Sequence, residues 1–287
     1  MGKKRAKEHY DFIRKQYHKE IDNSIANTTI HACESIEART PQYQNNYSVT
    51  PKDSVSCLFS LENKDNVAVL NFASYKKPGG LYFQGVESQE ESLCLESTLL
   101  PVIEAFKPTY YAWNNKHLNR GIYLNRALYS KDILFERERE KVYADVITCA
   151  APNAGVAEYV CGVGDKELRE AMLDRINFML SIAEEHGVQT LILGAWGCGV
   201  FEWNPETVAE LFMEVKGDII FQILYSPFLG YLNITIWFLI GGFRNSKTKM
   251  VFEILVAWEN EFVKIFTLFP EIHAPVLSYF ITLKHYS

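Results

Sequence analysis

The sequence predicts an α/β protein in which strands and helices alternate in a layered domain. Two apolar runs, residues 67–72 and 188–193, are short and uninterrupted, which is typical of strands buried on both faces. Residues 165–186 instead show the periodicity of an amphipathic helix. A glycine-rich loop and then a helix signal follow each apolar run, so both strands are expected to lead into turns that can approach a ligand closely.

The N-terminal segment is the first predicted element. An apolar residue recurs at steps of four on a charged background, which predicts one or two helices over residues 2–36. The apolar residues of this stripe are Ile13, Tyr17, Ile21 and Ile25. Residues 40–53 are polar and loop-like, and residues 55–61 fit either a strand or a short helix.

The middle of the chain continues the alternation. Residues 90–106 are predicted to form a helix that ends near Pro108, because proline cannot continue a helix interior. Residues 120–130 are predicted to be irregular, and residues 141–150 form a strand that runs into a loop.

The amphipathic helix at 165–186 has signals at both ends. Asp165 can cap its start, and Gly187 suits a left-handed residue after its end. After the second apolar run, Asn204 and Pro205 open a further helix, with Asn as the N-cap and Pro in the first turn.

Composition limits the classes of protein. The 287 residues, 48% apolar, are enough for one large domain or two small ones. A net charge of −6 argues against a broad nucleic-acid surface, so no direct nucleic-acid binding is expected. Six cysteines occur without a C-x-x-C pair or a zinc spacing, which suggests reduced thiols in the cytoplasm, or in the nucleus of a eukaryotic cell. The charged N-terminus carries no apolar secretory segment.

A Gln-Glu-Glu triplet at residues 89–91 follows the first glycine-rich loop. A carboxylate held beside such a loop and partly out of water is a candidate general acid. On spacing alone a structural interpretation is favoured: Ser88 could be an N-cap, with Glu91 completing a capping box. The triplet and the loop together favour chemistry on a phosphorylated or sugar ligand.

The second glycine-rich loop spans residues 194–201, between the second apolar run and the helix at Asn204. Its glycines are Gly194, Gly197 and Gly199. Backbone N–H groups in such a loop, together with a helix N-terminus, favour anion binding, although many loops of this kind are only tight turns. No Gly-Lys-Ser/Thr follows, which excludes a Walker A loop. Both loops follow parallel-type strands, so they could meet at the carboxyl edge of one sheet.

Five segments in matching order resemble the microbial-type poly(ADP-ribose) glycohydrolase (PARG) family over residues 49–215. They are 70–74 (LNFAS), 78–80 (PGG), 89–94 (QEESLC), 146–153 (VITCAAPN) and 193–201 (LGAWGCGVF). The resemblance implies a macrodomain-like three-layer α/β/α sandwich with a mixed sheet. It also implies a helical extension at 1–45, a catalytic domain at 46–269 with an atypical apolar insertion at 217–248, and a tail at 270–287.

The resemblance further implies a hydrolase that cleaves ribose–ribose or ribose–protein glycosidic bonds of poly(ADP-ribose) or ADP-ribose on modified proteins. Glu91 would be the general acid and base, Glu90 would hold the distal ribose, and neither a metal nor a cofactor is needed. The ligand-binding residues implied are Asn71, Gly79, Gly80, Gln89, Gly194, Gly197, Cys198, Gly199, Val200 and Phe201.

Leu81 departs from the family pattern, because it stands where the family has the third glycine of a triplet. A side chain there could crowd the ligand or require a negative φ. The alternative function is therefore an ADP-ribose-binding reader that turns over slowly or not at all.

A second departure is residues 219–243, which carry no charge. They could span a membrane, form two strands at 219–225 and 231–240, or bind a partner through an apolar surface, or residues 217–248 could be a gene-model artefact. A membrane span is disfavoured, because residues 250–255 resemble the closing strand of the family fold and residues 258–269 its last helix. The third functional hypothesis is a membrane- or partner-associated protein.

Overall fold

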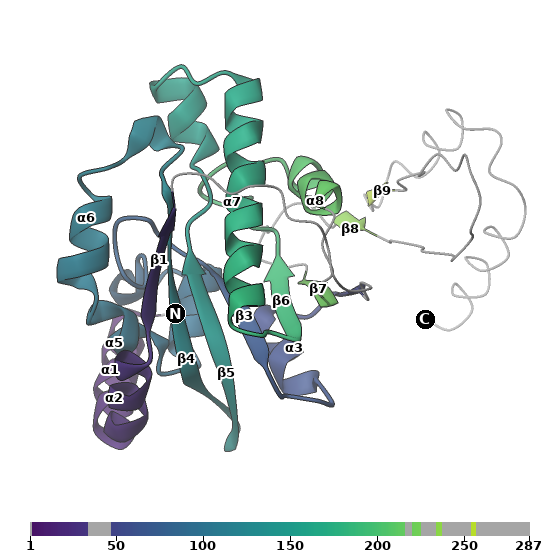
Figure 1. Cartoon of the computed structure of the whole chain (residues 1–287). Helices are drawn as coiled ribbons and strands as arrows, with labels where there is room; N and C mark the ends of the chain where they lie inside the picture. The colour runs from purple at the N-terminus through teal and green to yellow at the C-terminus, as the bar shows by residue number, and fades with distance from the viewer. Residues whose placement is uncertain (1, 34–46, 216–219, 225–233, 237–253, 257–287) are drawn as a thin grey trace, which may run out of the picture. The chain divides into compact units, whose positions relative to one another are not determined.

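The structure, a computed structural model, describes residues 2–33, 47–215, 220–224, 234–236 and 254–256, which fall into two units at residues 1–228 and 229–287. The first unit contains a seven-stranded sheet of order β1-β4-β5-β3-β6-β7-β2 (Figure 1). Its strands are β1 (Thr29–Cys33), β2 (Tyr47–Thr50), β3 (Val67–Phe72), β4 (Asn125–Arg137), β5 (Glu140–Cys149), β6 (Thr190–Gly194) and β7 (Ile220–Leu224).

The sheet is mixed. Strands β5, β3, β6, β7 and β2 run parallel to one another, whereas β4 is antiparallel to both β5 and β1. The central strand β3 lies between β5 and β6, and the apolar run that predicts it coincides with it. Because both its neighbours are parallel, the loops after β3, β5 and β6 leave the same edge of the sheet.

Two apolar cores cover the two faces of the sheet, so the predicted three-layer α/β/α fold is confirmed. Ala68 and Leu70 of β3 face a core shared with α7 and α8, which Figure 1 shows with α7 lying along the sheet. Val67 and Val69, which point the other way, face a core shared with α1 to α5. The helices are α1 (Lys3–Gln16), α2 (His18–Ala26), α3 (Ser54–Ser60), α4 (Gln89–Leu95), α5 (Leu99–Glu104), α6 (Ala112–Asn114), α7 (Asp165–Glu185) and α8 (Pro205–Glu214). Short turns complete the unit: 3₁₀-helices η1 (Tyr82–Gln84) and η3 (Asn119–Gly121), and π-helices η2 (Lys107–Tyr111) and η4 (Val156–Val160).

The N-terminal helices are confirmed, but they end earlier than predicted. After α2 the chain forms β1, which pairs with β4, so the helical prediction over 2–36 is wrong at Thr29–Cys33, and residues 34–36 lie outside the described residues. Ile13, Tyr17 and Ile21 are buried in the same core as α3, α4 and α5. The predicted domain boundaries at 45 and 269 stay predictions.

Two predicted elements in the middle of the chain are corrected. The helix expected over 90–106 is two helices, because Ser97 forms a bridge to Phe135 of β4 and its hydroxyl bonds both Leu93 O and the Leu99 N–H. The segment expected to be irregular at 120–130 contains the start of β4, whose pairing with β1 and β5 no local pattern shows.

The predicted cap of α7 is shifted by one residue. The N-cap of α7 is Gly164, and Asp165 is its first helical residue.

The second unit contains the strands β8 (Ile234–Ile236) and β9 (Ile254–Val256), which pair antiparallel with each other. Of the strand expected at 250–255, only residues 254 and 255 are described, and they lie in β9. Strand β7 lies within the first of the two strands expected, at 219–225, and β8 lies within the second, at 231–240. Among the described residues, no helix has the length and apolar character to cross a membrane. The predicted helix at 258–269, the tail at 270–287 and most of the uncharged segment lie outside the described residues.

Candidate active site at the carboxyl edge of the sheet

The two glycine-rich loops leave the same edge of the sheet, as predicted, because they follow the parallel neighbours β3 and β6. Helix α4 begins in the first of these loops with Gln89, Glu90 and Glu91, and its two glutamates are buried. The site is therefore built where parallel strands end, on a short helix that directs carboxylates back toward the preceding loop.

Glu91 does not cap its own helix. Ser88 occupies the N-cap position, but its side chain makes no capping hydrogen bond. The Glu91 Oε1 atom instead accepts the backbone N–H of Leu81 at 2.8 Å, across the loop. The capping-box interpretation is thus wrong, and the carboxylate is aimed at the glycine-rich loop.

Glu90 lies deeper than its neighbour, with 3% of its surface exposed. Its carboxylate accepts the backbone N–H groups of Ser74 at 2.8 Å and Gly79 at 3.2 Å, and the Asn71 amide at 3.4 Å. Burial raises the pKa of Glu90 to about 8, with a smaller upward contribution from Glu91, while the Ser74, Asn71 and Gly79 donors oppose the shift. A carboxyl group that is neutral over much of the neutral range thus lies directly beside Glu91.

Gly80 makes room for both carboxylates. Its φ is +53°, and a Cβ atom there would lie 2.6 Å from Glu91 Oε1 and 3.1 Å from Glu90 Oε2. Gly79 is restricted as well, with φ of +66° and a hypothetical Cβ 2.5 Å from Leu100 Cδ1. The two glycines therefore satisfy both a left-handed backbone and a close approach to the glutamates.

Leu81, the departure from the glycine triplet, fits this backbone without strain. Its φ is −111°, which side-chain-bearing residues adopt readily. Its side chain is 42% exposed, and it contacts Glu91 through its backbone N–H. The loop geometry that holds Glu91 is therefore compatible with leucine at this position.

Asn71 lies at the end of β3 and is fully buried. Its amide nitrogen donates to Glu90 and, at 3.3 Å, to the hydroxyl of Thr148 on β5. Its Oδ1 atom is buried without a hydrogen-bond partner among the described residues. An unpaired buried acceptor costs free energy, which marks this position as one that can gain from a donor.

Gln89, a predicted ligand-binding residue, uses both ends of its amide inside the protein. Its Oε1 accepts the Phe72 N–H at 2.8 Å, and its Nε2 donates to Leu70 O at 2.8 Å and to Ser54 Oγ at 3.2 Å. These bonds attach the start of α4 to the end of β3 and to α3. A role in ligand contact stays a prediction, and the bonds themselves position the helix.

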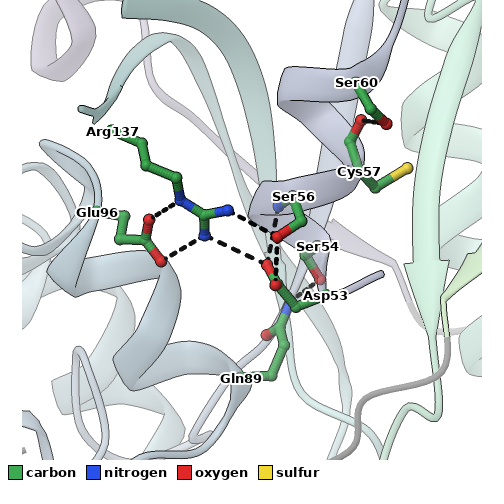
Figure 2. Close-up of polar contacts among 8 residues, drawn as sticks. All are labelled: Asp53, Ser54, Ser56, Cys57, Ser60, Gln89, Glu96 and Arg137. Atoms are coloured by element: carbon green, nitrogen blue, oxygen red, sulfur yellow. Dashed lines mark hydrogen bonds and ion pairs between the residues drawn. The ribbon is translucent and has the colours of Figure 1, made fainter. Parts of the chain in front are cut away.

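The other end of α4 is held by Arg137 of β4 (Figure 2). The guanidinium forms a two-pronged ion pair with Glu96, the C-cap residue of α4, through Nε and, at 2.8 Å, through Nη2. It also donates to Ser56 Oγ at 2.6 Å and lies 3.5 Å from Asp53, the residue that caps α3. Sequence reasoning missed Arg137 and Glu96, since 41 residues separate them and no local motif joins them.

The second loop contains most of the remaining predicted ligand residues. Gly197 has φ of +79°, and a Cβ there would lie 2.8 Å from Trp203 Cδ1, so this glycine is required for packing. Around Gly199, in contrast, nothing lies within 4 Å of a hypothetical Cβ, and Val200 is 82% exposed. Gly194 is the last residue of β6. Cys198 is buried, and burial raises the pKa of its thiol to about 12.

Phe201 of the second loop belongs to an aromatic group that the sequence did not indicate. Its ring lies 6.1 Å from that of Tyr123, which stacks on Tyr75 at 4.1 Å. Tyr75 follows β3, so these rings connect the two loops. Tyr75 and Tyr123 are buried, and Phe201, which follows the open backbone at Gly199 and Val200, packs against them.

Comparisons with known proteins agree with this site. The family described as "Microbial-type PARG, catalytic domain" matches residues 5–138, which include both glutamates and the first loop. No curated protein matches the chain.

Solved structures are similar to a larger part of the chain. The poly(ADP-ribose) glycohydrolase of Thermomonospora curvata is 25% identical with a TM-score of 0.68, over 78% of this chain and 92% of that one. The Deinococcus radiodurans enzyme in complex with ADP-ribose is 27% identical with a TM-score of 0.64, over 72% and 89% of the two chains. The Thermomonospora curvata enzyme bound to the inhibitor ADP-HPD, at 24% identity and a TM-score of 0.65 over 78% and 91%, shares the fold.

The fold and the site together define a macrodomain-like α/β protein with a glutamate pair facing a glycine-rich loop. The predicted relationship to the microbial-type PARG family is confirmed, and with it the predicted class of enzyme, a PARG-like glycosidase. The roles of the individual residues stay predictions.

Proposed function

We propose that the chain hydrolyses glycosidic bonds of poly(ADP-ribose), or of ADP-ribose attached to proteins, with Glu91 as the general acid and base. The observation that carries the proposal is the orientation of Glu91. Its carboxylate accepts the Leu81 N–H beside Gly80 and leaves its own helix uncapped. A reader module would have no use for an acid held in this position.

The reaction needs one proton donor and one water molecule. Glu91 would protonate the ribose oxygen that leaves when the C1″–O bond breaks, and water would then attack the oxocarbenium-like carbon. The water would return its proton to Glu91, which restores the starting state. Glu90 would hold the distal ribose hydroxyls, and Asn71, beside it, would contact the same sugar with its unpaired Oδ1.

The second loop would bind the diphosphate. Backbone N–H groups of Gly197, Cys198, Gly199 and Val200 are candidate donors, and the exposed position of Val200 leaves room for an anion. Phe201 and the tyrosines against which it packs would support the distal ribose. We also propose modified proteins as partners and the cytoplasm as the location; six free cysteines are compatible with a reducing compartment.

A specific observation supports a second candidate function. Leu81 stands where the family has glycine, and its side chain is 42% exposed next to the catalytic loop. A side chain there would narrow the space for the sugar or the diphosphate. The chain would then bind ADP-ribose as a reader with little turnover.

The experiment measures release of ADP-ribose from auto-modified polymer, and ADP-ribose binding by calorimetry, with wild type, Glu91→Gln and the surface control Glu62→Gln. Loss of a general acid is expected to lower the rate by about 10²–10⁴-fold while binding is retained. Wild-type and control rates should agree. Unchanged hydrolysis in Glu91→Gln would refute the role of Glu91, and binding without hydrolysis in wild type would establish the reader.

A further inference from the structure

Two histidines and a glutamate from distant parts of the chain converge outside the glutamate site. His31 lies on β1, whereas Glu185 and His186 lie at the end of α7. One potential metal ligand atom from each of the three lies within 4.8 Å of the other two. The Nε2 atoms of the two imidazoles are 3.0 Å apart, and His31 Nδ1 is 3.7 Å from a Glu185 oxygen.

The imidazole of His186 is held in a fixed orientation. It stacks on the ring of Tyr129 at 3.6 Å, with an angle of 5° between the planes, and the Tyr129 hydroxyl donates to Asp145. His31 meets His186 nearly at a right angle, with ring centroids 5.1 Å apart. Packing therefore directs the two Nε2 atoms toward one another before any ion is bound.

We propose that His31, His186 and Glu185 bind a divalent first-row transition ion of the Zn²⁺ class, with water completing the coordination. Two nitrogen ligands on a tetrahedral Zn²⁺ lie about 3.3 Å apart, given Zn–N bonds of about 2.0 Å, and the observed 3.0 Å is close to this value. Glu185 is exposed, so its side chain can swing inward. The Thr29 hydroxyl, 2.9 Å from His31 Nε2, is exposed and can turn away.

Such an ion would join β1, at the edge of the sheet, to the end of α7. The simplest competing explanation is a direct hydrogen bond between the two imidazoles, which also accounts for a separation of 3.0 Å. The two explanations differ in what Zn²⁺ does to the protein. An ion that binds only the folded state raises the Tm, whereas an imidazole pair without a site gives no such response.

The test titrates the full chain with Zn²⁺ by calorimetry and follows the Tm with and without Zn²⁺. Variants are His31→Ala, the nearly isosteric Glu185→Gln, and the control His18→Ala, which removes an exposed histidine at the start of α2. Wild type and His18→Ala are expected to bind one ion and to gain Tm. The affinity of His31→Ala for Zn²⁺ is expected to be at least about tenfold lower than that of wild type. The affinity of Glu185→Gln is expected to lie between those of wild type and His31→Ala.

Cobalt(II) supplies a second readout that separates these ligands from the exposed thiol of Cys161. Nitrogen and oxygen ligands give visible d–d bands without the near-ultraviolet thiolate charge-transfer band. Equal binding in wild type, His31→Ala and Glu185→Gln, absence of binding, or a thiolate spectrum would each overturn the proposal. None of these outcomes depends on glycohydrolase activity.

Discussion

Glu90 and Glu91 are neighbours in the chain, but their surroundings differ. Three N–H donors and nearly complete burial surround Glu90, while a single backbone N–H from Leu81 holds Glu91. Adjacent carboxyl groups in unlike environments are typical of sites where one group binds and the other transfers a proton. The proposed division of roles follows from this difference.

A substitution at Gly80 can be compared with a control substitution at the neighbouring Leu81. Gly80→Ala would place a Cβ 2.6 Å from Glu91 Oε1 at φ of +53°, so we expect a displaced carboxylate, a strong loss of hydrolysis and about 1–2 kcal/mol less stability. Leu81→Ala keeps the backbone N–H that binds Glu91, so hydrolysis should be retained. Polymer hydrolysis and thermal unfolding of both variants check this, and equal activities would contradict it.

The raised pKa of Glu90 makes stability depend on pH. The folded state holds this proton up to about pH 8, whereas the carboxyl in the unfolded chain releases it near its ordinary pKa of 4.5. The stabilising contribution is therefore complete below about pH 4.5 and is lost as the pH rises toward 8, by at most about 1.4 kcal/mol per pH unit.

The measurement is urea unfolding of wild type and Glu90→Gln between pH 6.5 and 8, with Glu62→Gln as the surface control. Wild type and control should lose stability across this range, and Glu90→Gln should lose less. Parallel curves for all three proteins would show that Glu90 is ionised throughout.

At the scale of elements, α4 spans residues Gln89–Leu95, which is too short to be stable on its own. Gln89 bonds its first turn to β3 and α3, and Arg137 bonds its C-cap Glu96 (Figure 2). The orientation of both glutamates therefore depends on contacts at the two ends of the helix.

Arg137→Met should loosen the end of α4. We expect a loss of about 1–2 kcal/mol of stability, moderated because the arginine side chain is 32% exposed, and a fall in kcat of roughly tenfold with little change in ADP-ribose binding. The control Arg169→Met removes an exposed ion pair between α7 and Glu214, and its kcat should not change. A kcat equal to wild type in Arg137→Met would show that α4 is held without this ion pair.

The same elements show what a sequence can predict. Strand β3, helix α7 and the Asn204 cap of α8 follow from local patterns, and each is present. The motif around Glu91 located the site. The start of β4, strand β1 and the break at Ser97 were missed because each depends on pairing with residues far along the chain. The Arg137–Glu96 ion pair was not predicted for the same reason.

At the scale of the molecule, the described buried residues of both cores lie between Ala6 and Phe212. A shortened chain that ends at Phe228 should therefore unfold in one cooperative transition and retain hydrolysis and ADP-ribose binding. Calorimetry and the polymer assay on the shortened and full chains check this. A shortened chain without a cooperative transition would show that the second unit is needed for folding.

The strand order has a consequence for synthesis on the ribosome. Strand β2 emerges early, yet its neighbour in the sheet is β7, with Tyr47 opposite Phe221. Until β7 is made, β2 has no backbone partner in the sheet, and closing so long a loop is slow. During translation the early half of the protein therefore carries an unpaired strand, a state that favours association with chaperones or with other nascent chains.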